Sequence, residues 1–319
     1  MKLIVEKKIK AILFNVEENV IGNLDIGNEY KTDRDNMDNN KLWLEFDYTA
    51  LGFIRMYQES VLNTNRDIAL LQKTEKFEIE VELVDGEYTI DDKDIFQYVD
   101  NLENSEINYI DEKMRLIRLF DNNCFNIKEA LVNIVITDPQ ENGSSYFNSK
   151  RPFPDRIYGE IKKLNLPDKK SIERINSFLT NTKLDFPNSK FSPDLLSKAC
   201  FLYDQTYTSP VLTLRFMTGV IGLETLLVDG KTELRYRLSR NCSMLLSENI
   251  DEYKKLLKRV KDIYDRRSEY VHNANIKKLN EEYVIDTRKI LHDVIFKIIE
   301  LNISQKELLE KLDLKGYND

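Results

Sequence analysis

The chain has 319 residues, of which 41% are hydrophobic and 32% charged, with ten glycines and seven prolines, so its composition excludes a fibrous or disordered protein. No apolar run approaches the roughly 20 residues that a membrane helix needs, and the N-terminal MKLIVEKKIKAILF lacks signal-peptide features, which predicts a cytoplasmic protein without membrane contact. Three cysteines and two histidines cannot supply the usual zinc-ligand spacings, so neither a metal nor another cofactor is expected.

The first 150 residues have the pattern of strands and turns. Apolar and polar side chains alternate in three segments, which predicts strands over 10–16, 41–48 and 76–84. The polar segment 28–40 is rich in Asp and Asn and predicts a loop. A short helix is expected over 95–102, and two further strands over 114–120 and 130–137. Gly, Ser, Asn and Pro cluster over 138–154, and we expect the domain boundary there.

The second half has the helical period, with apolar residues at steps of three and four. Six helices are expected, over 168–180, 192–207, 210–228, 231–247, 249–272 and 281–302. Their predicted start signals are Asp168, Ser192 with Pro193, and Pro210, while Asp229-Gly230 closes the third helix and Ser304 begins a short amphipathic one. We therefore predict an α+β protein of two domains, β-rich over 1–150 and an all-α bundle over 151–319.

The net charge of −8 conceals an asymmetry between these halves. From Arg151 onward there are 30 Lys and Arg against 25 Asp and Glu, which leaves 17 against 30 in the first 150 residues. An acidic first domain and a basic second domain suggest different partners, with nucleic acid a candidate for the second, although a charge imbalance is usually only a solvated surface.

One of the two histidines ends the helix predicted over 249–272. Arg267 falls in the apolar stripe of that helix, between Tyr264 and Val271, so its guanidinium needs an anionic partner or an opening in the core. His272 lies about 140° from Arg267 round an ideal helix, an angle that can close if the helix end frays. An Arg can grip a phosphodiester, a nearby His can move a proton, and in RNA the 2′-OH is the nucleophile, so no metal is required.

Glu224 points to the apolar side of the helix predicted over 210–228 and needs a partner. Arg267 is one candidate, in which case Glu224 would orient the guanidinium, and Arg237 or Arg240 in a structural ion pair is the other. The arginines of the fourth helix and the lysines of the fifth can grip an RNA backbone or form a solvated helix face. The sequence leaves both alternatives open.

Three segments in order resemble the HEPN superfamily, most closely the HEPN domain of ApeA-like anti-phage proteins. They are FMTGVIGLETLLV (216–228), ELRYRLSRNCSMLL (233–246) and IYDRRSEYVHNA (263–274), and the resemblance covers about Val211 to Ala274. It implies a metal-independent endoribonuclease that acts as a homodimer, with Arg and His of both protomers in one cleft, and leaves 2′,3′-cyclic phosphate and 5′-OH ends.

The resemblance also assigns roles to residues of this chain. Arg267 and His272 are implied as catalytic, with Ser268 as the polar residue after the arginine. Glu224 and Asn273 are further expected as supporting residues, and from charge and spacing contacts to RNA are expected from Arg237, Arg240, Lys258 and Arg266. Many relatives carry Gly where this chain has Asn273, and that difference bears on how the helix ends.

The N-terminal segments VIGNLDI, KLWLEFDY and RLIRLFDNN resemble the β-rich domain that precedes the HEPN module in ApeA-like proteins. The resemblance implies a sensor or regulator of an abortive-infection toxin, with a phage-derived or cellular trigger that the sequence does not name. One alternative is a non-catalytic HEPN module that dimerises or binds RNA or a nucleotide within a larger complex. Another is a structural arrangement in which Arg267 pairs with Glu224 and His272 lies far from any cleft.

Overall fold

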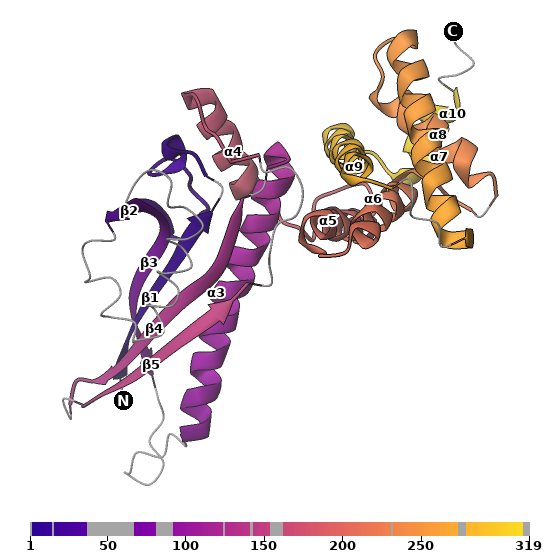
Figure 1. Cartoon of the computed structure of the whole chain (residues 1–319). Helices are drawn as coiled ribbons and strands as arrows, with labels where there is room; N and C mark the ends of the chain where they lie inside the picture. Colours follow the sequence, from indigo (N-terminus) through magenta and orange to yellow (C-terminus); the bar gives the residue numbers. More distant parts are fainter. Residues whose placement is uncertain are drawn as a thin grey trace. The chain divides into compact units, whose positions relative to one another are not determined.

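The computed structural model describes residues 2–14, 16–36, 67–80, 92–123, 125–140, 143–153, 162–230, 232–273 and 279–314. An antiparallel sheet in the N-terminal part is followed by a helical C-terminal part, so the protein is α+β (Figure 1). The chain forms two compact units, of which the first comprises 1–114, 125–155 and 163–181 and the second 115–124, 156–162 and 182–319.

The first unit contains a five-stranded antiparallel sheet in the order β2-β3-β1-β4-β5. The strands are β1 (Lys2–Phe14), β2 (Lys31–Asn36), β3 (Asp67–Glu80), β4 (Asn126–Asp138) and β5 (Gly143–Pro152). Central strand β1 places Val5, Lys7 and Ile9 on the buried face, with the less buried Glu6, Lys8 and Lys10 at alternating positions. The alternation that predicts strands near 10–16, 76–84 and 130–137 is thus confirmed within the described residues, and the strand predicted over 41–48 lies outside them.

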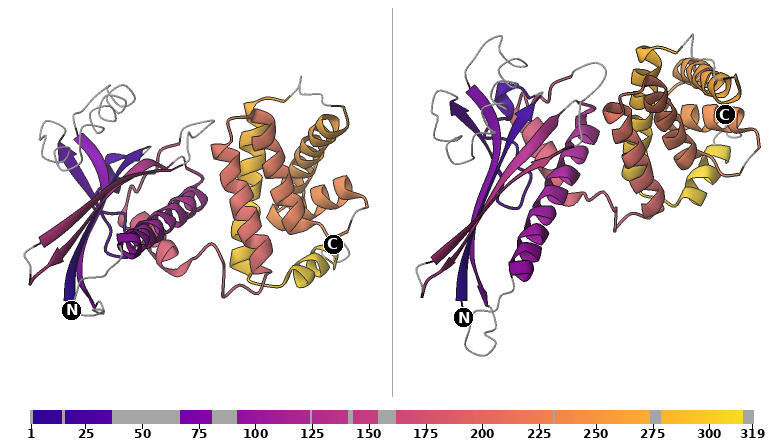
Figure 2. Two further views of the ribbon diagram at one scale, coloured as in Figure 1. Left: turned by 90° about the horizontal axis from the view of Figure 1, so that it is seen from below. Right: turned by 60° about the horizontal axis from the view of Figure 1, so that its bottom comes forward.

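Helix α3 (Asp92–Asp121) lies along one face of the sheet, as Figures 1 and 2 show. Its 30 residues include both the short helix predicted over 95–102 and the segment predicted as a strand over 114–120, so that strand prediction is wrong. The buried face of α3 has helical spacing, but Glu103, Glu106 and Lys113 interrupt its apolar residues. Because buried charges break the apolar pattern, the stripe is hidden in the sequence.

Both outer strands of the sheet were missed by the sequence pattern. Residues 31–36 fall in the predicted loop 28–40 but pair with β3 as β2. Strand β5 falls in the predicted boundary segment 138–154 and pairs with β4. Each pairs with one strand among the described residues, and the described side chains of β5 are mostly exposed, so the backbone of β5 pairs without the alternation that a buried face imposes.

The compact units also differ from the predicted domains 1–150 and 151–319. The first unit takes in α4 (Lys169–Asn181), and the second takes in the last turn of α3. Two contacts explain the place of α4, since Lys113 of α3 donates to the Leu179 carbonyl and the Asn176 side chain bonds the backbone of 23–25. Within the second unit, Arg118 forms a buried ion pair with Asp204. Such contacts join segments far apart in sequence, which periodicity does not report.

The helical unit contains α5 (Pro193–Thr208), α6 (Leu212–Leu227), α7 (Leu234–Leu246), α8 (Ile250–Asn273), α9 (Glu281–Leu301) and α10 (Gln305–Leu314). The six helices predicted between 168 and 302 are confirmed, with ends within a few residues. Asp168 accepts from Ser171, and Ser304 and Glu307 cap α10 reciprocally, as their sequence positions predict. Pro210 lies just before α6 rather than in its first turn.

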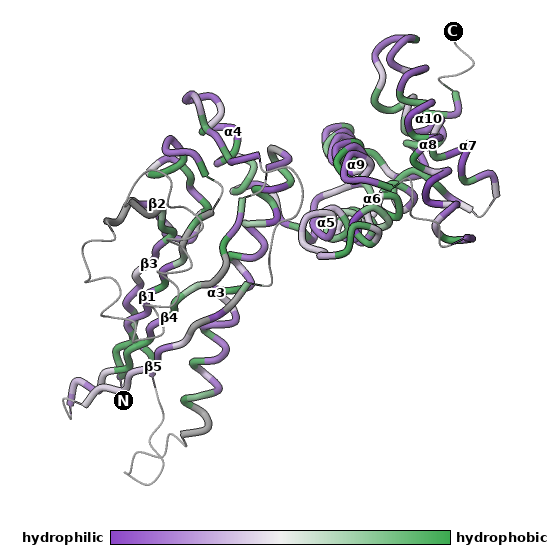
Figure 3. The backbone as a smooth tube through the Cα atoms, viewed as in Figure 1, coloured by the Kyte–Doolittle hydropathy of each residue, from purple (hydrophilic) through white to green (hydrophobic). Residues whose placement is uncertain are grey.

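Helix α6 is the most hydrophobic helix of this unit, as its green backbone in Figure 3 shows. It packs closely on α9 because Gly219 and Gly222 have no side chain. A Cβ at Gly219 would lie 2.7 Å from Thr287, and one at Gly222 would lie 2.6 Å from Leu291. Among the described helices, none is long and apolar enough to cross a membrane.

A buried ionic cluster joins α3 to the sheet. The Glu106 carboxylate accepts from Lys7 at 2.5 Å, Lys73 at 3.0 Å and the Tyr30 hydroxyl at 2.6 Å, and Glu75 contacts both lysines. Burial alone would raise the pKa of Glu106, but the donors from Lys7, Tyr30 and Lys73 outweigh it and hold that pKa below its ordinary value. The charged carboxylate is therefore the form that the folded sheet stabilises.

We predict that Glu106→Gln destabilises the sheet by about 3–5 kcal/mol at neutral pH, because it removes the buried charge between Lys7 and Lys73 and leaves them only the more exposed Glu75. Since the folded pKa of Glu106 is lowered, its contribution is present above the ordinary carboxyl pKa and is lost as the pH falls below about 5. The loss of stability and its pH dependence are both measured by urea denaturation at several pH values, with hydrogen exchange of the β1 amides as the readout for the sheet. Glu78→Gln, which removes only the exposed pair with Lys2, is the matched control. Equal urea midpoints for the two variants would contradict the account.

Candidate functional site

Helix α8 carries Arg267 and His272, and the burial along it differs from the predicted stripe. Val260, Ile263 and Tyr264 are buried as expected. Val271 is 49% exposed, so the apolar stripe does not continue into the last turn and its predicted core position is wrong. The core contact of α8 therefore ends near Tyr264, and the following two turns leave the packed interior.

Arg267 is held by groups from two helices. Its side chain is 21% exposed and that of Glu224 on α6 is 18% exposed, with 3.5 Å between Arg267 Nε and Glu224 Oε1. A second contact, from Nη2 to Glu224 Oε2, is also 3.5 Å, and the guanidinium lies 5.5 Å from the centre of the Tyr264 ring. Arg237 and Arg240 have other partners, so the structure pairs Glu224 with Arg267 and not with them.

This ion pair is long, and it does not offset the cost of burial. Burial raises the pKa of Glu224, and the nearby Arg267 guanidinium lowers it only in part. Arg267 Nε and Glu224 Oε1 are both buried without a hydrogen bond. A contact of 3.5 Å at the limit of hydrogen-bonding distance positions the guanidinium loosely and leaves donors available to an anion.

His272 is exposed in the last turn of α8, and the helix remains regular to Asn273. The predicted closing of the Arg267–His272 angle by fraying is thus wrong, because both residues lie within regular helix. Ideal geometry separates them by about 140° round the axis and about 7.5 Å along it. Within one chain the structure does not bring the two side chains together.

The other predicted supporting residues follow the same helix. Ser268 is half-buried beside Arg267, and Asn273 is exposed at the helix end. Neither described pocket of the helical unit is lined by Arg267 or His272. One alternative from the sequence was that Arg267 pairs with Glu224 while His272 lies far from any cleft. The structure contains that ion pair, and His272 is exposed on the surface of the chain.

Three of the four predicted RNA-contacting cations are already paired within the chain. Arg237 binds Asp229, Arg240 binds Asp313 at 2.9 Å, and Arg266 binds Glu269 at 3.1 Å. The fourth, Lys258, is exposed and has no ion pair among the described residues. Carboxylates before and after these arginines in the sequence neutralise them, which a count of basic residues does not reveal.

The sequence pattern did not single out Tyr236, which is 55% exposed on α7. It lines an open pocket with Arg235 of α7 and with Lys261 and Tyr264 of α8. The only sequence signal was an aromatic residue between two arginines, Arg235 and Arg237, and its exposure depends on how α7 packs on α8.

Cys200 and Cys242 are free and buried, and burial raises the pKa of both thiols, so they are packed in their neutral form. Across the part of the chain that the structure describes, no three His, Cys, Asp or Glu side chains gather as a metal site.

The comparisons with known proteins are negative. No protein-family model, no curated protein and no solved structure matches the chain.

We predict that Glu224→Gln leaves the free energy of unfolding at pH 7 unchanged or raises it by up to about 1 kcal/mol, because it removes a buried charge that its partner does not compensate. The raised pKa of Glu224 gives the direction of this change in stability. Because burial penalises the charged carboxylate, Glu224 destabilises the folded state at any pH above the ordinary carboxyl pKa, and Gln removes that cost. Chemical denaturation of both proteins at pH 7 is the measurement. A loss above about 2 kcal/mol would show that the pair is a structural element.

Proposed function

We propose that the protein is a metal-independent endoribonuclease of the HEPN type, in which Arg267 binds the scissile phosphate and His272 transfers the proton. The observation that carries the proposal is the placement of both residues in the last two turns of α8, with Arg267 at the edge of the core 3.5 Å from Glu224 of α6 and His272 exposed. The order of the segments in α6, α7 and α8, which resembles HEPN proteins, supports it.

The proposed reaction needs only the chain and its RNA substrate. The adjacent 2′-OH attacks the phosphorus, the bond to the 5′-oxygen breaks, and the products are a 2′,3′-cyclic phosphate and a 5′-OH. The Arg267 guanidinium compensates the charge that develops on the phosphate oxygens. His272 takes the proton of the 2′-OH or gives one to the leaving oxygen.

The angle between Arg267 and His272 requires two chains for this chemistry. Because the two side chains diverge by about 140° on a regular helix, one phosphate can contact both only if a second protomer completes the site. We therefore propose a homodimer in which Arg267 and His272 of different protomers face the same phosphate.

An exposed apolar row on α6 fits this second copy. Val211, Leu214 and Ile221 are 46%, 50% and 39% exposed, and positions 214 and 221 are seven residues apart on one face of the helix. Glu224, the partner of Arg267, follows Ile221 by one turn. A twofold contact through this row would place the Arg267 sites of two chains next to each other.

We further propose that the N-terminal unit senses a phage-derived or cellular signal and that the nuclease arrests growth as an antiviral toxin. The support is the resemblance of the N-terminal segments to ApeA-like proteins together with the separate sheet-based unit. As part of this proposal, the protein acts in the cytoplasm.

A non-catalytic HEPN module that binds RNA is the second candidate. It is favoured by one observation, namely that Arg267 and His272 diverge on the regular helix α8 within one chain. Such a module would retain RNA without cutting it.

We predict that Arg267→Ala and His272→Ala each lower the cleavage of RNA by about 10²- to 10⁴-fold while circular dichroism stays unchanged, because each removes a group that acts in the transition state. Arg267→Lys is also expected to fail, since an ammonium lacks the bidentate geometry. The measurement uses end-labelled total RNA in EDTA with analysis for cyclic-phosphate ends. Lys289→Ala, an exposed change on α9, is the control. Cleavage by both variants at the wild-type rate would show that the site is elsewhere.

A further inference from the structure

A row of unpaired lysines runs along α8. Lys254 and Lys258 are exposed, Lys261 is half-buried, and none of the three forms an ion pair with another described residue. Their spacing of four and three residues places them on one side of the helix. Two neighbouring carboxylates are occupied, because Asp265 binds Arg235 at 2.6 Å and Asp262 binds Arg259 at 3.2 Å. The three lysines of this row therefore present ammonium groups that no carboxylate of the described residues binds.

The same side of α8 leads to His272. On an ideal helix Lys254, Lys258, Lys261 and His272 lie within about 60° of one another round the axis, and Lys261 precedes His272 by about 16 Å. These angles and distances apply to α8 because it is helical from Ile250 to Asn273. A polyanion that follows the lysines would thus approach the proposed proton-transfer residue.

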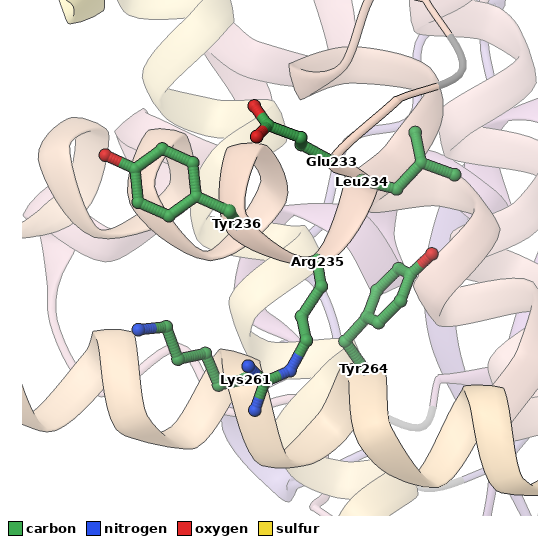
Figure 4. A pocket seen from close by; sticks show the side chains of 6 residues that line it. All are labelled: Glu233, Leu234, Arg235, Tyr236, Lys261 and Tyr264. Atoms are coloured by element: carbon green, nitrogen blue, oxygen red, sulfur yellow. The ribbon is translucent and has the colours of Figure 1, made fainter.

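A pocket with an exposed aromatic ring opens beside Lys261. It has a volume of about 470 Å³ between the start of α7 and the middle of α8 and is lined by Glu233, Leu234, Arg235, Tyr236, Lys261 and Tyr264. Figure 4 shows Tyr236 and Lys261 extending in the same direction from the two helices, with Arg235 between the helices. The Tyr264 ring that lines this pocket lies 5.5 Å from the Arg267 guanidinium, so the pocket adjoins the proposed site.

Aromatic rings beside cations are the features with which proteins bind unpaired nucleotides. A base of any identity can stack on a tyrosine ring, whereas a paired base has no free face. Lysine side chains hold phosphates as point charges and do not distinguish sequences. The combination fits a single strand better than an acidic peptide, which would contact the lysines but would leave Tyr236 without a partner.

We propose that this pocket is a nucleotide subsite, in which Tyr236 stacks on one unpaired base and Lys261, preceded by Lys258 and Lys254, holds the phosphates of a single-stranded RNA that continues toward His272. This inference rests on the proposed ribonuclease function and names its substrate class as single-stranded RNA.

The test uses the full chain and a labelled 2′-O-methyladenosine dodecamer, which lacks the nucleophilic hydroxyl and stays intact. An abasic dodecamer with the same number of phosphates separates stacking from charge. Tyr236→Leu is expected to weaken binding of the adenosine dodecamer about tenfold or more and to leave the abasic one unchanged, while Tyr236→Phe stays within about twofold of the wild type. Tyr236 is exposed, so these changes spare the core.

The lysine row is tested by salt dependence. Replacing Lys254, Lys258 and Lys261 with Gln is expected to reduce the slope of log affinity against log salt by about 2 for both dodecamers. Replacing Lys198, Lys289 and Lys311, one exposed lysine each on α5, α9 and α10, is the charge-matched control and should leave the slope unchanged.

Equal binding of the adenosine dodecamer by Tyr236→Leu and wild type would overturn the subsite, and so would equal losses for the two dodecamers or no binding by the wild type. Cleavage of unmodified RNA is measured in parallel. If the Tyr236 dependence is found without cleavage, the ribonuclease proposal fails and the subsite for single-stranded RNA stands.

Discussion

The helical unit depends on the close contact of α6 with α9, because that contact fixes the helix on which Glu224 is placed. Gly219 and Gly222 let the two backbones approach until Thr287 and Leu291 fill the space where a Cβ would lie. With one side of α6 buried in this way, Glu224 is held at the edge of the core, and it reaches Arg267 of α8. The surroundings of Arg267 on α8 therefore depend on the packing of α6 against α9, because that packing holds its partner Glu224 in place.

The Arg267 and Glu224 side chains are largely buried, but their attraction only partly offsets the cost of removing the two charges from water. Two separations of 3.5 Å leave a buried nitrogen and a buried oxygen without hydrogen bonds, and burial raises the pKa of Glu224. By contrast, the Glu106 cluster in the sheet unit has short contacts to three donors, and the pKa of its carboxylate is lowered. Both are buried ionic groups, but only the second has the geometry of a satisfied structural network. That difference is the physical reason for assigning the first to a binding site.

The sequence correctly located helices and strands where the spacing of apolar side chains directly reflects which side of the element is buried. It located the helices from α4 to α9 and the central strands, because a one-sided core imposes periods of 3.6 and 2. It failed at α3, where Glu103, Glu106 and Lys113 are buried, and at the outer strands β2 and β5, whose described side chains are mostly exposed.

The candidate site was also only partly predictable. Arg267 and Glu224 could be paired as candidates because both interrupt apolar stripes. Arg237 pairs with Asp229 in the link before α7, and Arg240 pairs with Asp313 of α10. These pairs and the exposure of Tyr236 depend on how the segments fold against α7, so side-chain periodicity does not report them.

The central claim is that Arg267 of one protomer and His272 of another act on one phosphate. The most direct measurement mixes the Arg267→Ala and His272→Ala proteins under conditions in which subunits exchange, and follows RNA cleavage in EDTA. A site shared between chains predicts recovery to about one quarter of wild-type activity at equal mixing, because half of the dimers are mixed and one of their two sites keeps both groups. No recovery, with subunit exchange confirmed by differently labelled chains, would contradict a shared site.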